Sequence, residues 1–224
     1  MAGWGESDGG LSPRESATAA EKADPQWART AFHVASMTLA MLYFYFSDRA
    51  GGYILAGVGT LAVLLDLARV YGKRTRALVP AFLERMVRPE EERRLSAISG
   101  FVAAAVLVDV AVLWGGLSKD IVLAAVGFAA VGDPAARLVG TTWGRIRILG
   151  THKTLEGSLA FFVAGLLAAR LLCLACGASF SWSQLIVGGL VATTVELVST
   201  SWDNFNVPFW STAAMGLFVG VGAL

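Results

Sequence analysis

The sequence predicts an all-α integral membrane protein with seven transmembrane helices. The 224 residues are 55% hydrophobic and only 16% charged, with a mean hydropathy of +0.61. Soluble domains are closer to half apolar and a quarter charged. The apolar residues are gathered into runs that approach the roughly 20 residues a helix needs to cross a bilayer. We expect spans at about 28–47, 52–70, 96–115, 120–139, 155–174, 184–200 and 207–223.

The basic residues predict the orientation of these spans. With the N-terminus inside, fifteen of the 18 Lys and Arg residues fall on the inner side, and only Arg49, Lys119 and Arg170 fall outside. Cytoplasmic loops carry an excess of Lys and Arg. We therefore expect a cytoplasmic N-terminus and an outside C-terminus. The formal net charge of +1 argues against a nucleic-acid partner, which would call for a clearly basic chain.

The chain divides into a polar tail and one membrane domain. Residues 1–27 have mixed charge and no apolar core, so we expect a disordered cytoplasmic tail rather than a signal peptide. Residues 28–224 form the seven-helix domain, with a cytoplasmic loop at 70–95 and an active-site loop at 137–154. The first loop is expected to anchor the topology or to carry an interfacial helix around 81–87.

Two carboxylates lie inside apolar segments, where an ionisable side chain is costly and is by default a functional hypothesis. Asp133 and Glu196 each lie about 13 residues, or roughly 20 Å of helix, from the outer end of their spans. They share one level in the cytoplasmic half of the bilayer, where the Gly-Asp-Pro sequence at 132–134 is expected to break the fourth helix. Hard cations take carboxylate oxygens and leave positions for phosphate, so this pair predicts a Mg²⁺ site.

Polar residues at the cytoplasmic helix ends predict a site for phosphate. A helix N-terminus with small residues lets backbone N–H groups approach a phosphate. Phosphoryl transfer needs acidic residues that bind a metal ion and, beside them, cationic residues that neutralise the charge on the phosphate. The residues are Lys153, Thr154, Glu156, Gly157 and Ser158 at the fifth span, Asp203 and Asn204 before the seventh, and Arg29 and His33 in the first.

Structural interpretations of the same residues stay open. They are a kinked helix end for Asp133, an ion pair with a neighbouring arginine for Glu196, a helix-dipole complement for Glu156, packing for His33, and topology charges for Arg145 and Arg147. Structural ion pairs are expected between Asp66 and Arg69 and between Asp109 and Arg170. Cys173 and Cys176 are interpreted as small apolar filling rather than a redox or metal pair.

A P-loop is excluded, although GRIRILGTHKT is superficially similar to one. Five residues separate Gly144 from Gly150, and two more precede Lys153. The P-loop requires Gly-x4-Gly-Lys-[Ser/Thr] directly after a strand.

In order along the chain, the motifs resemble those of the CTP-dependent lipid kinases, the family of dolichol, phytol and farnesol kinases and CTP-using diacylglycerol kinase. The resemblance covers most of residues 29–215. It rests on Gly132-Asp133, Gly140, Gly144, the HKTLEGS run from His152 to Ser158, Glu196, Asp203-Asn204-x3-Pro208, and Arg29-x3-His33. Thr30 and Trp202 depart from the family's Lys and Asp. The KTLEGS form is closer to dolichol and prokaryotic polyprenol kinases than to the other branches.

The resemblance implies a membrane kinase that uses Mg²⁺ and transfers the γ-phosphoryl group of CTP to the hydroxyl of a long-chain isoprenoid alcohol. It implies catalytic roles for Asp133, Lys153 and Glu196, and metal ligation by Asp133, Glu196 and Asp203. Nucleotide contacts are expected from Arg145, Arg147, His152, Thr154, Glu156, Gly157, Ser158, Asp203 and Asn204, and lipid contacts from Arg29 and His33.

Three alternatives stay open: diacylglycerol as the acceptor, cytidylyl transfer onto phosphatidate, and, in another class, an ion-coupled transporter. The absence of an inverted repeat and the one-sided clustering of polar residues count against the transporter. We expect the active site to face the cytoplasm, from the plasma membrane of a prokaryote or the endoplasmic reticulum of a eukaryote. The expected partners are the lipid alcohol, the nucleotide and membrane lipids, with self-association into a homo-oligomer allowed.

Overall fold

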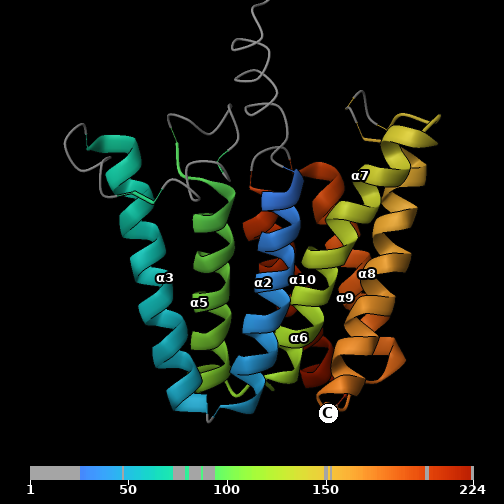
Figure 1. The fold of residues 1–224 in the computed structure, drawn as a ribbon. Helices are drawn as coiled ribbons and strands as arrows, with labels where there is room; N and C mark the ends of the chain where they lie inside the picture. Colours follow the sequence, from blue (N-terminus) through green and yellow to red (C-terminus); the bar gives the residue numbers. More distant parts are fainter. Residues whose placement is uncertain are drawn as a thin grey trace, which may run out of the picture.

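A computed structural model describes residues 26–46, 48–72, 79–80, 87, 94–148, 151, 153–199 and 202–222, and all regular elements in these ranges are helices (Figure 1). In chain order they are α2 (Gln26–Tyr45), α3 (Asp48–Tyr71), α5 (Ala97–Gly115), α6 (Asp120–Gly127), the π-helix η3 (Phe128–Gly132), α7 (Asp133–Thr142), α8 (Leu155–Ala175), α9 (Trp182–Val198) and α10 (Asp203–Gly222). Each of the seven predicted segments coincides with one helix, because α6, η3 and α7 run on as a single one.

Four of these helices are long and apolar enough to cross a membrane, so the chain is an integral membrane protein. They are Arg49–Tyr71, Ala97–Gly115, Asp120–Thr142 and Leu155–Ala175. Shorter apolar helices cover Ala35–Tyr45 and Trp182–Val198. The count of seven spans and the N-inside orientation stay predictions.

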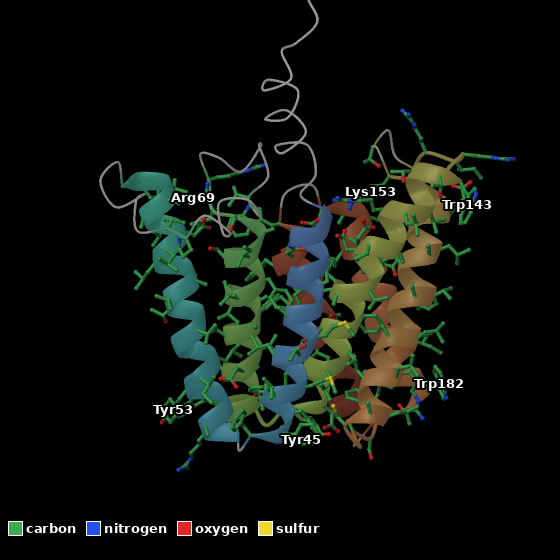
Figure 2. The ribbon with its side chains drawn as sticks, viewed as in Figure 1. Tyr45, Tyr53, Arg69, Trp143, Lys153 and Trp182 are labelled. Carbon is green, nitrogen blue, oxygen red and sulfur yellow. The ribbon has the colours of Figure 1, made fainter. Side chains whose placement is uncertain are left out.

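The helices alternate in direction, so the connections gather at two ends of the bundle (Figure 1). Figure 2 places Arg69, Trp143 and Lys153 at the upper end of the view and Tyr45 and Trp182 at the lower end. Tyr45, Trp143 and Trp182 are exposed, as expected of the aromatic belts at membrane interfaces. The upper end is the one predicted to be cytoplasmic.

The outer surface of α8 shows how the sequence suits a lipid environment. Leu159, Val163, Leu167 and Leu171 recur every fourth residue and are exposed, whereas the opposite face is buried and built mostly of small residues. That buried face includes Gly157, Ser158, Gly165, Ala168, Ala169 and Cys173. Small residues let helices approach closely within a membrane, while lipid tails cover the leucines.

The fourth helix is the centre of the bundle. Every residue from 121 to 130 is buried, and α6 packs against α2, α8 and α10. A Cβ atom added to Gly127 would lie 2.6 Å from the Cα atom of Ala169 on α8. The absence of a side chain at Gly127 therefore sets the separation of these two helices.

The expected break at Gly132-Asp133-Pro134 is wrong, because the helix continues through it. Pro134 has no N–H and its ring crowds the preceding helical turn. The π-helical turn η3 comes directly before it, and such a turn widens the helix locally and changes the hydrogen-bond register. Asp133 thus begins a further ten-residue helix, α7, which reaches Thr142 and shortens the predicted loop.

The ion pair between Asp66 and Arg69 is confirmed, with 2.8 Å between Oδ1 and Nη2. The Asp66 carboxylate also accepts the backbone N–H of Ser96 and the hydroxyl of Ser99, both at 2.6 Å. Arg69 donates to the carbonyl of Arg94 at 2.7 Å. This buried network holds the end of α3 against the start of α5.

The pair predicted between Asp109 and Arg170 is wrong. Asp109 accepts the hydroxyl of Tyr43 at 2.6 Å, and Arg170 donates to the carbonyl of Phe180 at 3.0 Å and lies over the ring of Trp182. Each residue therefore has its own partner at the lower end. Cys173 and Cys176 are free and buried in the apolar core, which is the packing role that the sequence favours.

Three predictions fall on residues outside the described part of the chain. They are the tail up to residue 25, most of the loop at 70–95 with the interfacial helix predicted over 81–87, of which only residue 87 is described, and the nucleotide contact of His152. The side chain of Arg29 is also outside it.

Candidate active site

A cavity of about 520 Å³, lined mainly by polar and charged residues, lies where α7, the start of α8, the end of α9 and the start of α10 meet. It brings together residues that are far apart in the sequence. Its lining is Asp133, Ala136, Arg137, Gly140, Thr141, Thr151, Lys153, Thr154, Gly157, Ser158, Glu196, Leu197, Ser199 and Asp203. Lys153, at the upper end of the bundle in Figure 2, marks its position.

Helix α7 supplies more of the residues that line the cavity than any other helix. Asp133, Arg137 and Thr141 lie four residues apart and line it, as expected for residues stacked on one helical face. Leu138, between them in sequence, is 62% exposed and lies outside the lining. Both charged residues of α7, Asp133 and Arg137, therefore line the cavity, whereas Leu138 is exposed outside it.

A small hairpin-like connection leads from α7 to α8. Ile148 donates its N–H to Lys153 at 3.1 Å, and Leu155 donates to Ile146 at 2.9 Å. Both carboxylate oxygens of Glu156 lie 3.3 Å from the N–H of Ile146. Glu156 therefore holds the connection in place and is not part of the cavity lining.

Thr154 is the N-cap of α8, and its Oγ1 accepts the N–H of Gly157 at 3.2 Å. The glycines around it leave room for this cap: a Cβ added to Gly144 would lie 2.6 Å from that oxygen, and one added to Gly157 would lie 3.0 Å from it. The spacing of glycines from 140 to 157 thus allows α7 to pack against the first turn of α8.

Several backbone N–H groups at the start of α8 already have acceptors within the protein. Leu155 donates to Ile146, Gly157 to the Thr154 hydroxyl and Ser158 to the Thr154 carbonyl. The N–H groups of Leu155 and Gly157 are among those that a helix N-terminus would offer to an anion, whereas the Ser158 bond is the ordinary bond within the helix. The helix dipole still favours an anion there, but direct N–H contacts to phosphate, as the sequence predicts, would require these bonds to open.

Ser158 presents a different kind of donor. Its side chain is 7% exposed and lines the cavity, and its Oγ has no hydrogen-bond partner. A buried hydroxyl without a partner costs free energy. A ligand oxygen in the cavity would satisfy it.

Lys153 and Glu196, which both line the cavity, form an ion pair with 2.7 Å between Nζ and Oε1. The same Nζ donates to the backbone carbonyl of Glu196. The Glu196 side chain is 8% exposed and that of Lys153 is 27% exposed. The structural interpretation left open for Glu196 was a pair with an arginine, and the partner is this lysine instead.

The remaining predicted residues divide into two groups. Seven line the cavity together: Asp133, Lys153, Thr154, Gly157, Ser158, Glu196 and Asp203. Five described residues are outside the lining: His33, Arg145, Arg147, Glu156 and Asn204. Arg145 and Arg147 are exposed, and Asn204 donates its N–H to Asp203 Oδ1 at 3.1 Å.

Sequence reasoning missed Arg137, Thr141, Thr151 and Ser199, which also line the cavity. Arg137 was counted only as a topology charge. The spacing of Asp133, Arg137 and Thr141 by four residues was the available signal, because it places three polar side chains on one helical face. A helix assumed to break at Pro134 hides that spacing.

The acids suit Mg²⁺ only if other ligands complete its coordination. Asp133, Glu196 and Asp203 line one cavity. Within the part of the chain that the structure describes, no three His, Cys, Asp or Glu side chains are grouped closely enough to hold a metal ion alone. Mg²⁺ commonly uses one or two carboxylates, several waters and substrate phosphates. The residues present fit an ion that binds together with a nucleotide.

The fold and the cavity define an integral membrane protein with a polar, charged site at one end of its helical bundle. Among known proteins, the chain is similar to an uncharacterized protein of Rickettsia prowazekii. The two are 26% identical over 198 residues, which cover 84% of this chain and 92% of that protein. It is 31% identical over 99 residues to the dolichol kinases of Bos taurus and Homo sapiens.

The similarity to dolichol kinases is partial. The aligned residues are 43% of this chain and 18% of each kinase. The resemblance predicted from the motifs is confirmed to this extent. No family profile matches the chain, and no solved structure matches it.

Proposed function

We propose that this protein is a membrane lipid kinase that transfers the γ-phosphoryl group of a nucleotide, CTP by preference, to the hydroxyl of a long-chain isoprenoid alcohol. The observation that carries the proposal is the polar cavity, in which acids, cations and an unpartnered hydroxyl meet at one end of an apolar bundle. The partial similarity to dolichol kinases supports the same chemistry.

In the proposed reaction Asp133 accepts the proton of the alcohol. The alcohol oxygen forms a bond to the γ-phosphorus while the bond from that phosphorus to the β–γ bridging oxygen breaks. The products are the lipid phosphate and the nucleoside diphosphate. General-base catalysis of this kind contributes about 10²- to 10⁴-fold, and alignment of the two substrates contributes further.

Charge neutralisation is the second task of the site. Lys153, which precedes α8, and Ser158, in the first turn of α8, both line the cavity. A loose phosphoryl-transfer transition state spreads its charge over the transferred oxygens, and positive groups fixed in a poorly hydrated site stabilise it. Asp133 and Asp203, joined by Glu196 when its pair with Lys153 opens, would hold a Mg²⁺ ion that binds together with the nucleotide. The ion would supply further positive charge at the transferred phosphate.

The environment of the cavity favours a lipid acceptor. Leu138 on α7 and Leu155 and Leu159 on α8 are all at least half exposed, next to residues that line the cavity. In a bilayer these side chains contact acyl chains. An isoprenoid tail can therefore remain in the hydrocarbon while its hydroxyl reaches Asp133.

The test is a product analysis with purified protein in lipid nanodiscs. The protein is incubated with Mg²⁺, with CTP or ATP labelled in the γ position, and with dolichol, polyprenol, phytol, farnesol or diacylglycerol in turn. We expect label in an isoprenoid phosphate and release of CDP. Transfer to diacylglycerol changes only the acceptor, whereas release of pyrophosphate indicates a cytidylyltransferase. Absence of nucleotide consumption with every lipid would contradict the proposal, and ion flux in proteoliposomes would then favour a transporter.

A further inference from the structure

Arg137 lines the cavity and is an exposed residue. It lies one helical turn from Asp133 on the same face of α7, and no hydrogen bond or ion pair of its guanidinium is found among the residues that the structure describes. A charge that served only to set topology would need no position inside a cavity. Leu138 next to it is 62% exposed and does not line the cavity.

The other positive groups nearby are already engaged or placed elsewhere. Lys153 is bound to both the carboxylate and the carbonyl of Glu196. The N–H groups of Leu155 and Gly157 at the start of α8 have acceptors within the protein. Arg145 and Arg147 do not line the cavity. Of the described cations, Arg137 is thus the one that lines the cavity without an ionic partner.

A second, independent observation points to a polar ligand in the cavity. Ser158 Oγ lines the same cavity, is more than nine-tenths buried and has no hydrogen-bond partner. A phosphate oxygen between α7 and α8 would accept from Ser158 and from a guanidinium. Arginine suits this ligand because its planar fork donates two parallel hydrogen bonds to phosphate.

We propose that Arg137 clamps the β- and γ-phosphates of the nucleotide and stabilises the charge that develops during transfer, an inference that rests on the proposed kinase function. α7 runs from Asp133 towards Trp143 at the upper end of the bundle (Figure 2). Arg137 therefore lies about 6 Å along the helix from Asp133, on the side of the open end. The nucleotide enters from that end, and the alcohol approaches Asp133 from the hydrocarbon.

The experiment compares Arg137→Ala and Arg137→Lys with Arg49→Ala, which removes an exposed arginine from the opposite end of the bundle. The kinetic constants for the nucleotide are measured in nanodiscs, with and without added guanidinium at non-denaturing concentration. We expect Arg137→Ala to lose about 10²- to 10³-fold in kcat/KM. Arg137→Lys should recover only part, because an ammonium cannot form the bidentate contact. Added guanidinium should partly restore Arg137→Ala, and Arg49→Ala should match the wild type.

The outcomes separate this inference from the proposed function. If the wild type phosphorylates a lipid and Arg137→Ala keeps its kcat/KM, the role of Arg137 is refuted and the kinase stands. If Arg137→Ala loses activity together with thermal stability, and guanidinium restores nothing, the residue is structural and the inference is also refuted. If the wild type neither binds nor consumes nucleotide, the proposed function fails and this inference fails with it.

Discussion

Lys153 and Glu196 meet in an ion pair of 2.7 Å, although 42 residues of sequence lie between them. The lysine precedes α8, and the glutamate lies two residues before the end of α9. A second hydrogen bond from Nζ to the Glu196 carbonyl fixes the lysine further. The pair thus connects two helices and holds a positive charge at the wall of the cavity.

Glu196→Gln tests how much the ion pair with Lys153 contributes, because it leaves the hydrogen bond from Lys153 to the backbone carbonyl of residue 196 possible. The amide keeps the size of the side chain but removes the charge that pairs with Lys153. We expect a loss of about 1–3 kcal/mol in stability, below the 3–5 typical of a fully buried pair, because Lys153 is 27% exposed. Activity should also fall, because the lysine loses its fixed position. Lys153→Met completes a double-mutant cycle, and a coupling energy near zero would show that the pair contributes nothing.

Asp133→Asn tests the proposed base. The substitution removes a carboxylate at the start of α7, and we expect turnover to fall by about 10²-fold or more. Asp120→Asn is the matched control, since Asp120 begins the same continuous helix at its other end. Its carboxylate accepts the N–H of Ser179 at 3.3 Å, a bond that an amide oxygen can also accept. If Asp133→Asn kept the same activity as Asp120→Asn and the wild type, Asp133 would be excluded from the chemistry.

The helical architecture was predictable because each apolar segment is long and distinct. Composition and window length suffice to locate such helices. The continuity of the fourth helix was not predictable, because Gly132 and Pro134 are local breakers and the π-helical turn that accommodates them forms within a closely packed environment. A Cβ added to Gly132 would lie 2.9 Å from a ring atom of Phe161. Phe161 belongs to α8, and contacts between helices cannot be read from the local sequence around Pro134.

The cavity was predictable in part for a related reason. Depth along the spans indicates that Asp133 and Glu196 lie at one level, and both line the cavity. Depth carries no information on rotation about the helix axis, so the partner of Glu196 and the inward position of Arg137 could not be deduced from it. The pairing of Asp109 with Arg170 failed likewise: similar depth did not make them neighbours.

Asp66→Asn should destabilise the upper end of the bundle around α3 and α5, and Asp66 does not line the cavity. The carboxylate accepts from Arg69, Ser96 and Ser99 in a buried network. An amide would leave Arg69 without its counter-ion and turn one acceptor into a donor, which costs about 3–5 kcal/mol. Ser99→Ala removes one hydroxyl and should cost about 1 kcal/mol. The nucleotide KM of folded Ser99→Ala should equal that of the wild type, and an altered KM would link this network to the site.

Gly127→Ala tests whether the close approach of α6 and α8 stabilises the bundle. The new Cβ would lie 2.6 Å from the Ala169 Cα and 2.7 Å from its nitrogen, and backbone atoms cannot rotate away as a flexible side chain can. The two helices must separate, with a cost of about 1–3 kcal/mol. Gly57→Ala is the matched control, because a Cβ there meets nothing within 4 Å. It should keep or slightly raise stability, since alanine favours the helix.

The two free cysteines supply the measurement for Gly127→Ala. Cys173 is 0% exposed and Cys176 is 8% exposed, so a thiol-reactive fluorescent dye should label them only when the bundle opens. Cys173 lies one turn after Ala169 on α8 and therefore reports on the contact that Gly127 makes. We expect labelling of Gly127→Ala at a lower temperature than labelling of the wild type and of Gly57→Ala. Coincident melting curves for all three would mean that α6 and α8 tolerate a wider separation, and that Gly127 does not set the position of the central helix on which Asp133 is carried.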